Sequence, residues 1–533
     1  MREFRIHSDI DHLSRELNDP VNLAQILLKQ KMIAVNRKSS FTEFVSELKT
    51  RSIDLLKKRS ILYLVVKHID DKWIIRGLLA GSLIISIYFE DNVSGIKLLG
   101  SNAYEQVVKN IQIENPVIKY SIGSILFEDL PESIKGIVQN VIETALSIQP
   151  PSIWLNKYLY DMYIEKSISD KGGYVYVLLG RDRIGRRYAV KIPREKTIDG
   201  KPLAVGSNST TIAEVFKGFV NCLEVSQMTR EDLKRGLNLL GYDESYVDEI
   251  IVYKKYILKP RAIIMFRDVY SLEEYFETPP VVIEDYADRG DLDSKVRIKP
   301  LDERELVYIS VRLAGALSLI HIARLLHMDI KPQNILLISD EYEPYGYAPL
   351  ISDLVGSPHV YDKNIDLKKS TPEYAEPFSL ITGKVDFSYD TYSLGVTLFY
   401  TATGRRLIGR MFVNILTLKE IYGVQVPIKS FLIDYPDLTK YYNSVERLLK
   451  DYRNKNISIQ ELLDSINNIV QEIDGESLTH IYKLLSNEVS SIIIKSISLD
   501  KATRYSDAVL LWRDFIEAIK EKGYLNLIPS KTI

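Results

Sequence analysis

The residues with the clearest chemical potential lie in the stretch HMDIKPQNILL, residues 327–337. Asp329 offers a carboxylate that can stand beside an acceptor hydroxyl, and Lys331 can offset the charge of a phosphate in transfer. Asn334 can turn back and hold a Mg²⁺ ion through its amide oxygen. The apolar run after Asn334 predicts a buried strand that anchors the loop. A surface turn around a proline is the alternative, but it does not explain the order of the polar residues.

A long helix is expected to deliver this loop, because residues 303–326 carry apolar side chains at helical spacing. The loop itself resembles the catalytic loop of the eukaryotic-type Ser/Thr protein kinase family, whose pattern is His-Arg-Asp-x-Lys-Pro-x-Asn. Kinase-like sequence begins near residue 158 and continues almost to the C-terminus, with an archaeal-like N-terminal accessory domain before it. The resemblance implies ATP and Mg²⁺ as cofactors, with Mn²⁺ as the alternative metal, and protein substrates with Ser or Thr acceptors.

One position in the loop departs from the family pattern. Met328 replaces the arginine that normally pairs with an activation-loop phosphate. We therefore expect activity that does not depend on such a phosphate.

The segment DKGGYVYV, residues 170–177, takes the place of the glycine-rich loop that covers the nucleotide phosphates. Gly172 matches the middle glycine and Val177 matches the valine above the adenine. Asp170 and Val175 stand where the other two glycines belong. By itself this segment predicts a β-hairpin turn, so its interpretation depends on the strand that follows.

That strand is YAVK, residues 188–191, which resembles the Val-Ala-x-Lys strand of the family. The resemblance implies that Lys191 contacts the α- and β-phosphates and that Ala189 lines the nucleotide site. A lysine on a strand is otherwise usually a solvated charge.

The family holds this lysine with a glutamate of a regulatory helix. We prefer Glu249, because the strand after it is recognisable and the extra residues then form one insertion around 195–243. Glu214, which lies on a helical pattern closer to Lys191 in sequence, remains the alternative. Either glutamate could instead be a solvated helix charge.

Residues 281–292, VVIEDYADRGDL, resemble the strand and hinge that join the two lobes of a kinase. The Gly-Asp-Leu ending sets a register in which Glu284 is the gatekeeper and the backbones of Asp285 and Ala287 meet the adenine edge. A charged gatekeeper departs from the family, and a shift by one residue is the alternative. A strand followed by a turn is expected in both registers.

The segment ISDLVG, residues 351–356, stands where the family has Asp-Phe-Gly. The resemblance implies that Asp353 binds the Mg²⁺ that bridges the phosphates, together with Asn334. Val355 replaces the glycine and restricts the backbone, so we expect this segment to flip less readily.

The segment STPEYAEPF, residues 370–378, resembles the Gly-Thr-x-x-Tyr-x-Ala-Pro-Glu segment of the family. The resemblance implies that Thr371 bonds to Asp329 and Lys331, which favours Ser or Thr over Tyr as the acceptor. Phe378 stands where a glutamate normally pairs with an arginine of a late helix.

Two structural residues follow from the same resemblance. Arg504 matches the late-helix arginine, and Glu376 is one candidate for its partner. Asp390 is expected to accept hydrogen bonds from the backbone of the catalytic loop.

The expected fold class is α+β, a two-lobed kinase-like fold preceded by a small α+β domain. The strands expected in that domain are residues 61–67, 73–79, 82–89 and 96–99. The sequence predicts an N-terminal regulatory or interaction domain at 1–148 and a linker at 149–157. The kinase-like part then has an N-lobe at 158–290 and a C-lobe at 291–525, and the C-lobe has an enlarged region around 405–490.

Composition narrows the class of protein. The formal net charge of −2 gives no electrostatic case for a nucleic-acid partner. A single cysteine, Cys222, excludes a disulfide framework within the chain. The most apolar stretch, residues 77–89, is too short to span a bilayer. We therefore expect a cytoplasmic protein without a membrane span.

Two other functions compete with a protein kinase. The weak glycine loop and Val355 would suit a pseudokinase that acts as a nucleotide-binding regulatory scaffold. A small-molecule kinase could share the fold, although the Thr371 segment is a protein-kinase feature. The N-terminal domain is expected to regulate or to mediate self-association rather than to catalyse.

Overall fold

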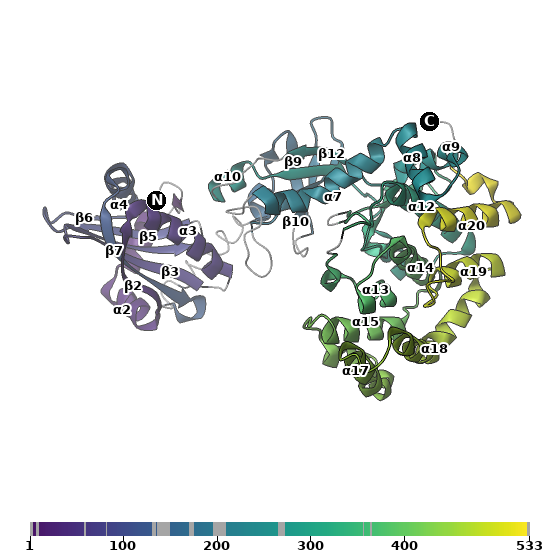
Figure 1. Ribbon diagram of the computed structural model, residues 1–533. Helices are drawn as coiled ribbons and strands as arrows, with labels where there is room; N and C mark the ends of the chain where they lie inside the picture. The colour runs from purple at the N-terminus through teal and green to yellow at the C-terminus, as the bar shows by residue number, and fades with distance from the viewer. Residues whose placement is uncertain are drawn as a thin grey trace. The chain divides into compact units, whose positions relative to one another are not determined.

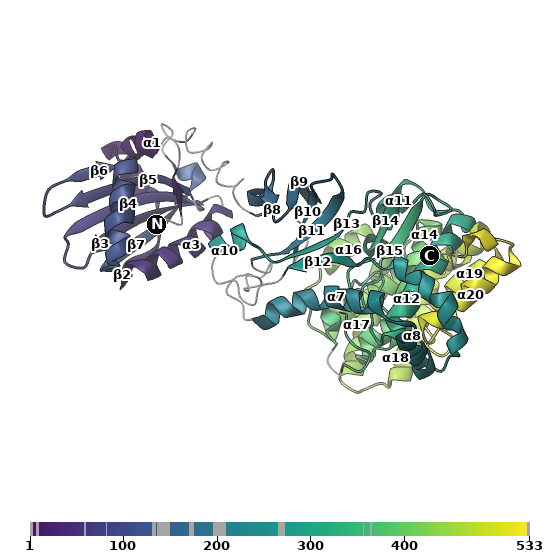
Figure 2. The ribbon, with the colours of Figure 1, turned by 90° about the horizontal axis from the view of Figure 1, so that it is seen from above.

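The chain folds into two compact units, one formed by residues 1–172 with 271–279 and the other by residues 173–270 with 280–533. Helices and sheets occur in both units, as Figures 1 and 2 show, and this confirms the predicted α+β class. The computed structural model describes residues 4–6, 10–57, 60–81, 83–130, 135, 150–169, 175–195, 209–264, 272–354, 357–362 and 365–529.

A seven-stranded sheet forms the centre of the first unit. Its strand order is β1-β5-β4-β3-β7-β2, with β6 paired to β5. β1 lies parallel to β5, and the pairs β2–β7, β3–β7, β3–β4, β4–β5 and β5–β6 are antiparallel. The strands are β1 (Arg5–Ile6), β2 (Lys31–Ser40), β3 (Ser60–His68), β4 (Trp73–Ala80), β5 (Leu83–Asp91), β6 (Lys97–Leu99) and β7 (Val117–Leu126).

Helices cover both faces of this sheet, because successive side chains of a strand point to opposite faces. On β3, Leu62 and Leu64 pack into one apolar core with α3 and α4, whereas Ile61 and Tyr63 pack into another with α1 and α2. The helices are α1 (Ile10–Leu17), α2 (Pro20–Lys29), α3 (Phe41–Lys57), α4 (Gly100–Gln106) and α5 (Gln112–Glu114).

The first unit also contains a short segment around α10 (Leu272–Glu277). Trp154 Nε1 donates a hydrogen bond to the carbonyl of Phe276 at 2.9 Å, and the hydroxyl of Tyr160 donates to the carbonyl of Pro279 at 2.7 Å. These bonds tie residues 272–279 to the chain that precedes β9.

A second sheet has the strand order β12-β13-β11-β10 in the second unit, and β8 pairs with β9 in the first unit. Its members in the second unit, β10 to β13, pack against α7 through Phe216 and Phe219, which contact Val282. We call these strands with α7 the β-rich lobe. The bounds are β8 (Tyr158–Leu159), β9 (Met162–Ser169), β10 (Val175–Arg181), β11 (Arg187–Pro193), α7 (Ser209–Gln227), β12 (Pro260–Ile264) and β13 (Val281–Asp285).

The rest of the second unit is a helical lobe built around two helices that are buried on nearly all sides, as interior helices are. Residues 306–322 of α12 and all residues of α14 are buried. The first elements of this lobe are α8 (Arg230–Leu240), α9 (Val247–Ile250), α11 (Leu292–Ile298), α12 (Glu303–Ile322), β14 (Ile335–Ser339), β15 (Tyr347–Ile351), α13 (Pro377–Thr382) and α14 (Phe387–Thr403).

The last helices of this lobe are α15 (Ile408–Glu420), α16 (Ile428–Asp434), α17 (Thr439–Arg453), α18 (Ile459–Leu484), α19 (Asn487–Ser496) and α20 (Ala508–Glu521). Helices α15 to α18 share an apolar core of their own and occupy the region expected to be enlarged. Among the described helices, α12 alone is long and apolar enough to cross a membrane, but 94% of its apolar window is buried inside the protein.

Residues 230–258 correct the predicted insertion around 195–243. Leu233, Leu237 and Tyr253 belong to the same core as α12, so this stretch packs in the helical lobe. A Cβ atom at Gly236 would lie 2.4 Å from Cγ2 of Ile322, so glycine is what allows α8 to approach α12 this closely. Of the predicted insertion, α8 therefore packs in the helical lobe, whereas α7 packs against the strands of the β-rich lobe.

Candidate active site

The loop after α12 is held by the carboxylate of Asp390 on α14. Its two oxygens accept hydrogen bonds from the backbone amides of His327 at 2.7 Å and Met328 at 2.9 Å. Met328 has a positive φ of 69°, which turns both amides toward the same carboxylate. The predicted contact of Asp390 with the loop backbone is confirmed.

The side chains of the loop converge on Asp329. Lys331 Nζ lies 2.7 Å from Asp329 Oδ2, and Thr371 Oγ1 donates to Asp329 Oδ1 at 2.7 Å. Lys331 Nζ also donates to Thr371 Oγ1 at 3.1 Å. Because a third of the Asp329 side chain remains exposed, its carboxylate is both oriented and open to a reacting group.

Asn334 lies on the other side of the same carboxylate. Its Nδ2 donates to the Asp329 carbonyl at 2.8 Å and to Asp329 Oδ2 at 3.0 Å. These bonds engage the amide nitrogen, so the amide oxygen is the atom of this side chain that could bind a metal ion.

Asp353 reaches this end of the site because β14 and β15 form an antiparallel hairpin. Asn334 precedes β14 and Asp353 follows β15, so both lie at one end of the hairpin. Ser352 joins them, since its backbone amide and its Oγ donate to the Asn334 carbonyl at 2.9 and 2.8 Å. Asp353 has a positive φ of 65°.

This donor set fits Mg²⁺ better than a transition metal. One carboxylate and one amide oxygen are hard ligands, and Mg²⁺ is usually held by one or two carboxylates plus substrate phosphates. Within the described ranges, no cluster of three or more His, Cys, Asp or Glu side chains could hold a metal by itself.

Lys191 on β11 forms a buried ion pair with Glu284 on β13, with Nζ 2.7 Å from Oε2. Nζ also lies 5.2 Å from the centre of the Phe219 ring of α7. Burial disfavours the charged lysine, but the charges of Glu284 and Asp353 outweigh burial and raise its pKa.

The structure does not bring Glu249 to Lys191. Glu249 is exposed on α9, whose neighbours belong to the helical lobe. The helix that contacts Lys191 is α7, which lies beside β12 in Figures 1 and 2. Glu214 lies on α7, but its side chain is outside the described residues. The helix beside Lys191 is therefore the one that carries the alternative residue, Glu214.

The residues expected around the nucleotide share one face of the β-rich sheet. Val177 is opposite Lys191 in the β10–β11 pair, and Ala189 lies two residues from Lys191 on the same strand. Gly172, predicted to cover the phosphates, lies outside the described residues.

The predicted hinge follows β13 directly. The carboxylate of Asp285 accepts two hydrogen bonds from Arg261, at 2.8 and 2.7 Å. The carbonyl of Ala287 accepts the amide of Gly290 at 3.2 Å, which closes the turn into α11. The side chain of Asp285 is thereby engaged outside the site, so its backbone is what remains for a ligand.

Sequence reasoning missed Glu284 as the partner of Lys191 and Phe219 as its neighbour. The strand register contains the signal for Glu284. Val282 is the cross-strand neighbour of Lys191, and Glu284, two positions beyond Val282, lies on the same face of the sheet as Lys191. That signal becomes usable once β11 and β13 are known to be adjacent. Phe219 had no sequence signal beyond an apolar position on a helix.

The segment after Thr371 is anchored in the helical lobe. Arg504 Nη2 lies 2.9 Å from Glu376 Oε1, and both side chains are fully buried. Glu376 also accepts the backbone amides of Phe378 at 3.0 Å and Ser379 at 2.6 Å, and thus caps α13. The prediction of Glu376 as the partner of Arg504 is confirmed.

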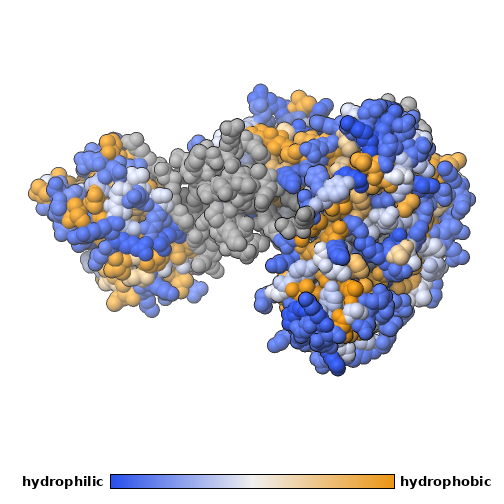
Figure 3. Space-filling view, in the orientation of Figure 1, coloured by the Kyte–Doolittle hydropathy of each residue, from blue (hydrophilic) through white to orange (hydrophobic). Residues whose placement is uncertain are grey.

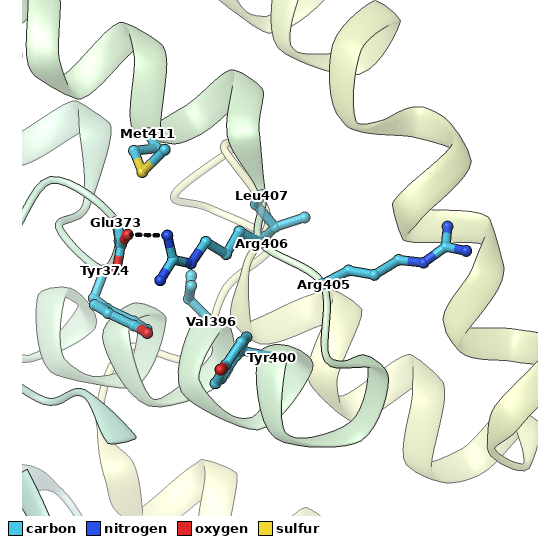
Figure 4. A pocket seen from close by; sticks show the side chains of 8 residues that line it. All are labelled: Glu373, Tyr374, Val396, Tyr400, Arg405, Arg406, Leu407 and Met411. Carbon is cyan, nitrogen blue, oxygen red and sulfur yellow. Dashed lines mark ion pairs between the residues drawn. The ribbon is translucent and has the colours of Figure 1, made fainter. Parts of the chain in front are cut away.

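A small hollow lies next to this segment, as Figure 4 shows. Arg406 extends across it to Glu373, with Nη1 3.1 Å from Oε1. Glu373 is two residues beyond Thr371, so the hollow lies beside the segment that contacts Asp329. The residues that line it are Glu373, Tyr374, Val396, Tyr400, Arg405, Arg406, Leu407 and Met411.

Comparison with known proteins relates the chain to protein kinases. The family model described as protein kinase domain matches residues 225–516. The serine/threonine-protein kinase ArnS of Sulfolobus acidocaldarius is 28% identical over 276 residues, which cover 48% of this chain and 39% of the relative. The serine/threonine-protein kinase PknK of Mycobacterium tuberculosis is 35% identical over 126 residues, 24% of this chain and 11% of the relative.

An Aurora kinase of Debaryomyces hansenii is 23% identical over 315 residues, which cover 56% of this chain and 71% of the relative. The match to ArnS and PknK spans 39% and 11% of their lengths. The similarity to these proteins therefore concerns a domain rather than their whole chains.

Proposed function

Because the chain belongs to the protein kinase family, we propose that it transfers the γ-phosphoryl group of ATP to serine or threonine hydroxyls of protein substrates. The observation that carries the proposal is the arrangement of Asp329, Lys331 and Thr371, in which one carboxylate is oriented by an ammonium and a hydroxyl. Asp329 accepts the proton of the acceptor hydroxyl, and Lys331 offsets charge at the transferring group.

ATP, when bound with a divalent metal, supplies the phosphoryl group, and four residues of the chain are proposed to hold it. Asn334 and Asp353 bind Mg²⁺, with Mn²⁺ as the alternative, through their side-chain oxygens. Lys191 contacts the phosphates, and the backbone of Ala287 meets the adenine edge. The proximity of Lys191 to Asp353 supports this, since the charge of Asp353 acts on Lys191 and raises its pKa.

The direct test is incubation of the purified chain with labelled ATP, Mg²⁺ and a generic protein substrate, with chelated metal as the blank. We expect label in phosphoserine or phosphothreonine. ATP binding without transfer under varied conditions would instead support the nucleotide-binding scaffold. Label on a small molecule alone would support a small-molecule kinase.

We also expect the protein to be active without phosphorylation. Met328 packs against an apolar cluster that includes Leu367, Tyr389 and Leu418, so this position holds the activation segment by apolar contact rather than by a charge. Phosphatase-treated protein is expected to keep its activity within about twofold, and Ser370→Ala is expected to behave likewise, since it removes one hydrogen bond to Tyr389.

Met328→Arg is the matched contrast for that experiment. It places an unpaired charge beside the apolar cluster, so we expect lower activity in the unphosphorylated protein. Loss of wild-type activity on phosphatase treatment would contradict the inference drawn from Met328.

We propose that residues 1–148 regulate or assemble the protein, with self-association through the exposed apolar side chains of α2 and the edge strand β2. Figure 3 shows hydrophobic residues gathered at the lower edge of the first unit, where α2 lies in Figure 1. β2 ends the strand order of its sheet, and an unpaired edge is a site for pairing with another chain. The exposed side chains are Val21, Leu27, Leu28, Met32 and Val35.

A chain that begins at Ser152 is expected to retain phosphoryl transfer and to lose self-association, because the helical lobe has its own core. Light scattering and the labelled-ATP assay measure the two properties separately. Leu28→Glu in the full chain is the matched variant, since it alters an exposed residue alone. Complete loss of transfer in the folded shorter chain would make the first unit part of the catalytic apparatus.

A further inference from the structure

The contact between Lys191 and Glu284 follows from strand register. In the antiparallel pair of β11 and β13, Lys191 is opposite Val282 and Ala189 is opposite Glu284. Lys191 and Glu284 are therefore diagonal neighbours on one face of the sheet, a separation that long side chains can bridge. The 2.7 Å ion pair is thus part of the sheet and involves no helix.

Burial makes this contact costly to lose. The Glu284 side chain is 3% exposed and that of Lys191 is 14% exposed. A buried charge is tolerated when it is paired, and removing one member leaves the other uncompensated. The pair therefore holds the ammonium of Lys191 at one position over the sheet.

The surroundings of Lys191 contain few other charges among the described residues. Asp353 is the second carboxylate that acts on it. Helix α7 contributes the Phe219 ring and Cys222, whose pKa is raised to about 12 by burial and by Glu284, so the thiol stays neutral. Glu224 of α7 is exposed to solvent.

We propose that Glu284 is the positioning residue for Lys191, so that a carboxylate on strand β13 orients the phosphate-binding lysine. The inference rests on the proposed kinase function and identifies a residue that acts through Lys191. It implies that Lys191 remains oriented wherever α7 lies, because neither member of the pair is on α7. Movement of α7 is then not what switches this lysine on or off.

Glu284→Gln tests the proposal, because it keeps the size of the side chain and removes its charge. We expect turnover to fall more than tenfold, which corresponds to about 1.4 kcal/mol of barrier. Glu284→Asp keeps the charge on a shorter side chain and is expected to recover part of the rate. Glu224→Gln, on the exposed side of α7, is the matched control and is expected to change the rate by less than twofold. A melting curve of each variant separates loss of orientation from loss of folding.

A second measurement reports on Lys191 without any turnover. Acetic anhydride acetylates the unprotonated amine, and mass spectrometry gives the rate at each lysine. Loss of the Glu284 charge lowers the pKa of Lys191, because it removes the largest of the contributions that oppose burial. At pH 9 we expect Lys191 to react at least tenfold faster in Glu284→Gln than in the wild type, with the other lysines unchanged. If Glu284→Gln does not fold, Glu284→Asp is measured instead, with an intermediate increase expected.

Three outcomes would overturn the proposal. The first is wild-type turnover in folded Glu284→Gln, and the second is unchanged acetylation of Lys191. The third is a loss of turnover in Glu214→Gln or Glu249→Gln that equals the loss in Glu284→Gln, since that would mean that a helix glutamate orients Lys191. If the wild type itself transfers no phosphate, the proposed function fails, while the acetylation rates still test the ion pair.

Discussion

Asp329→Asn is expected to reduce phosphoryl transfer by roughly 10²–10⁴-fold, the usual contribution of a positioned general base. Asparagine keeps the size of the side chain and can still accept the Thr371 hydroxyl, so the local geometry survives. It cannot take up the acceptor proton. It also leaves Lys331 without the carboxylate that lies 2.7 Å from its Nζ.

Nucleotide affinity separates this effect from a damaged site. Asp329 faces Lys331, Thr371 and Asn334 rather than the strand that carries Lys191, so the dissociation constant of a fluorescent nucleotide is expected to stay within about threefold. Asp340→Asn is the matched control, because Asp340 lies at the opposite end of the β14–β15 hairpin and accepts the Tyr342 amide. Turnover near the wild-type level in Asp329→Asn would remove Asp329 from the reaction.

The catalytic loop could be predicted from sequence because its chemistry is local. Asp329, Lys331 and Asn334 lie within six residues, and their mutual contacts follow from one turn of the backbone. The contact of Thr371 with Asp329 required the family resemblance, since no local rule brings residue 371 to residue 329. The structure places both where that resemblance implied.

The partner of Lys191 could not be predicted in the same way. Its position depends on which strands are neighbours and in which register, and neither is visible in the local pattern. Glu249 was preferred because a recognisable strand follows it. In the structure, residues 230–258 turn their apolar side toward α12, whereas α7 places Phe216 and Phe219 against the strands. Helical periodicity shows that a face is apolar but does not show which core it joins.

The first unit shows the same limit. Residues 61–67 and 73–79 were predicted as strands and correspond to β3 (Ser60–His68) and β4 (Trp73–Ala80). Both strands are strongly apolar because helices cover both faces of their sheet. β2 was missed because most of its side chains are exposed and only Ala34 is buried, so the strand has no regular apolar alternation.

The activation segment gives a second large effect, this time on stability. Glu376→Gln is expected to lower the free energy of unfolding by about 3–5 kcal/mol, the usual result of removing one member of a buried ion pair. The cause is that Arg504, which is fully buried, loses the carboxylate 2.9 Å away. The same change weakens the cap of α13, since Glu376 accepts the amides of Phe378 and Ser379.

Denaturant unfolding of the full chain, followed by tryptophan fluorescence, measures the loss. Glu476→Gln is the matched control, because Glu476 is 93% exposed and its pair with Arg405 is 3.8 Å long. An exposed pair of this kind contributes little, so the control is expected to match the wild type. The double variant Glu376→Gln/Arg504→Met is expected to be more stable than Glu376→Gln, because it no longer buries an unpaired guanidinium. Equal stability of Glu376→Gln and Glu476→Gln would mean that the activation segment is held by its apolar neighbours and not by this ion pair.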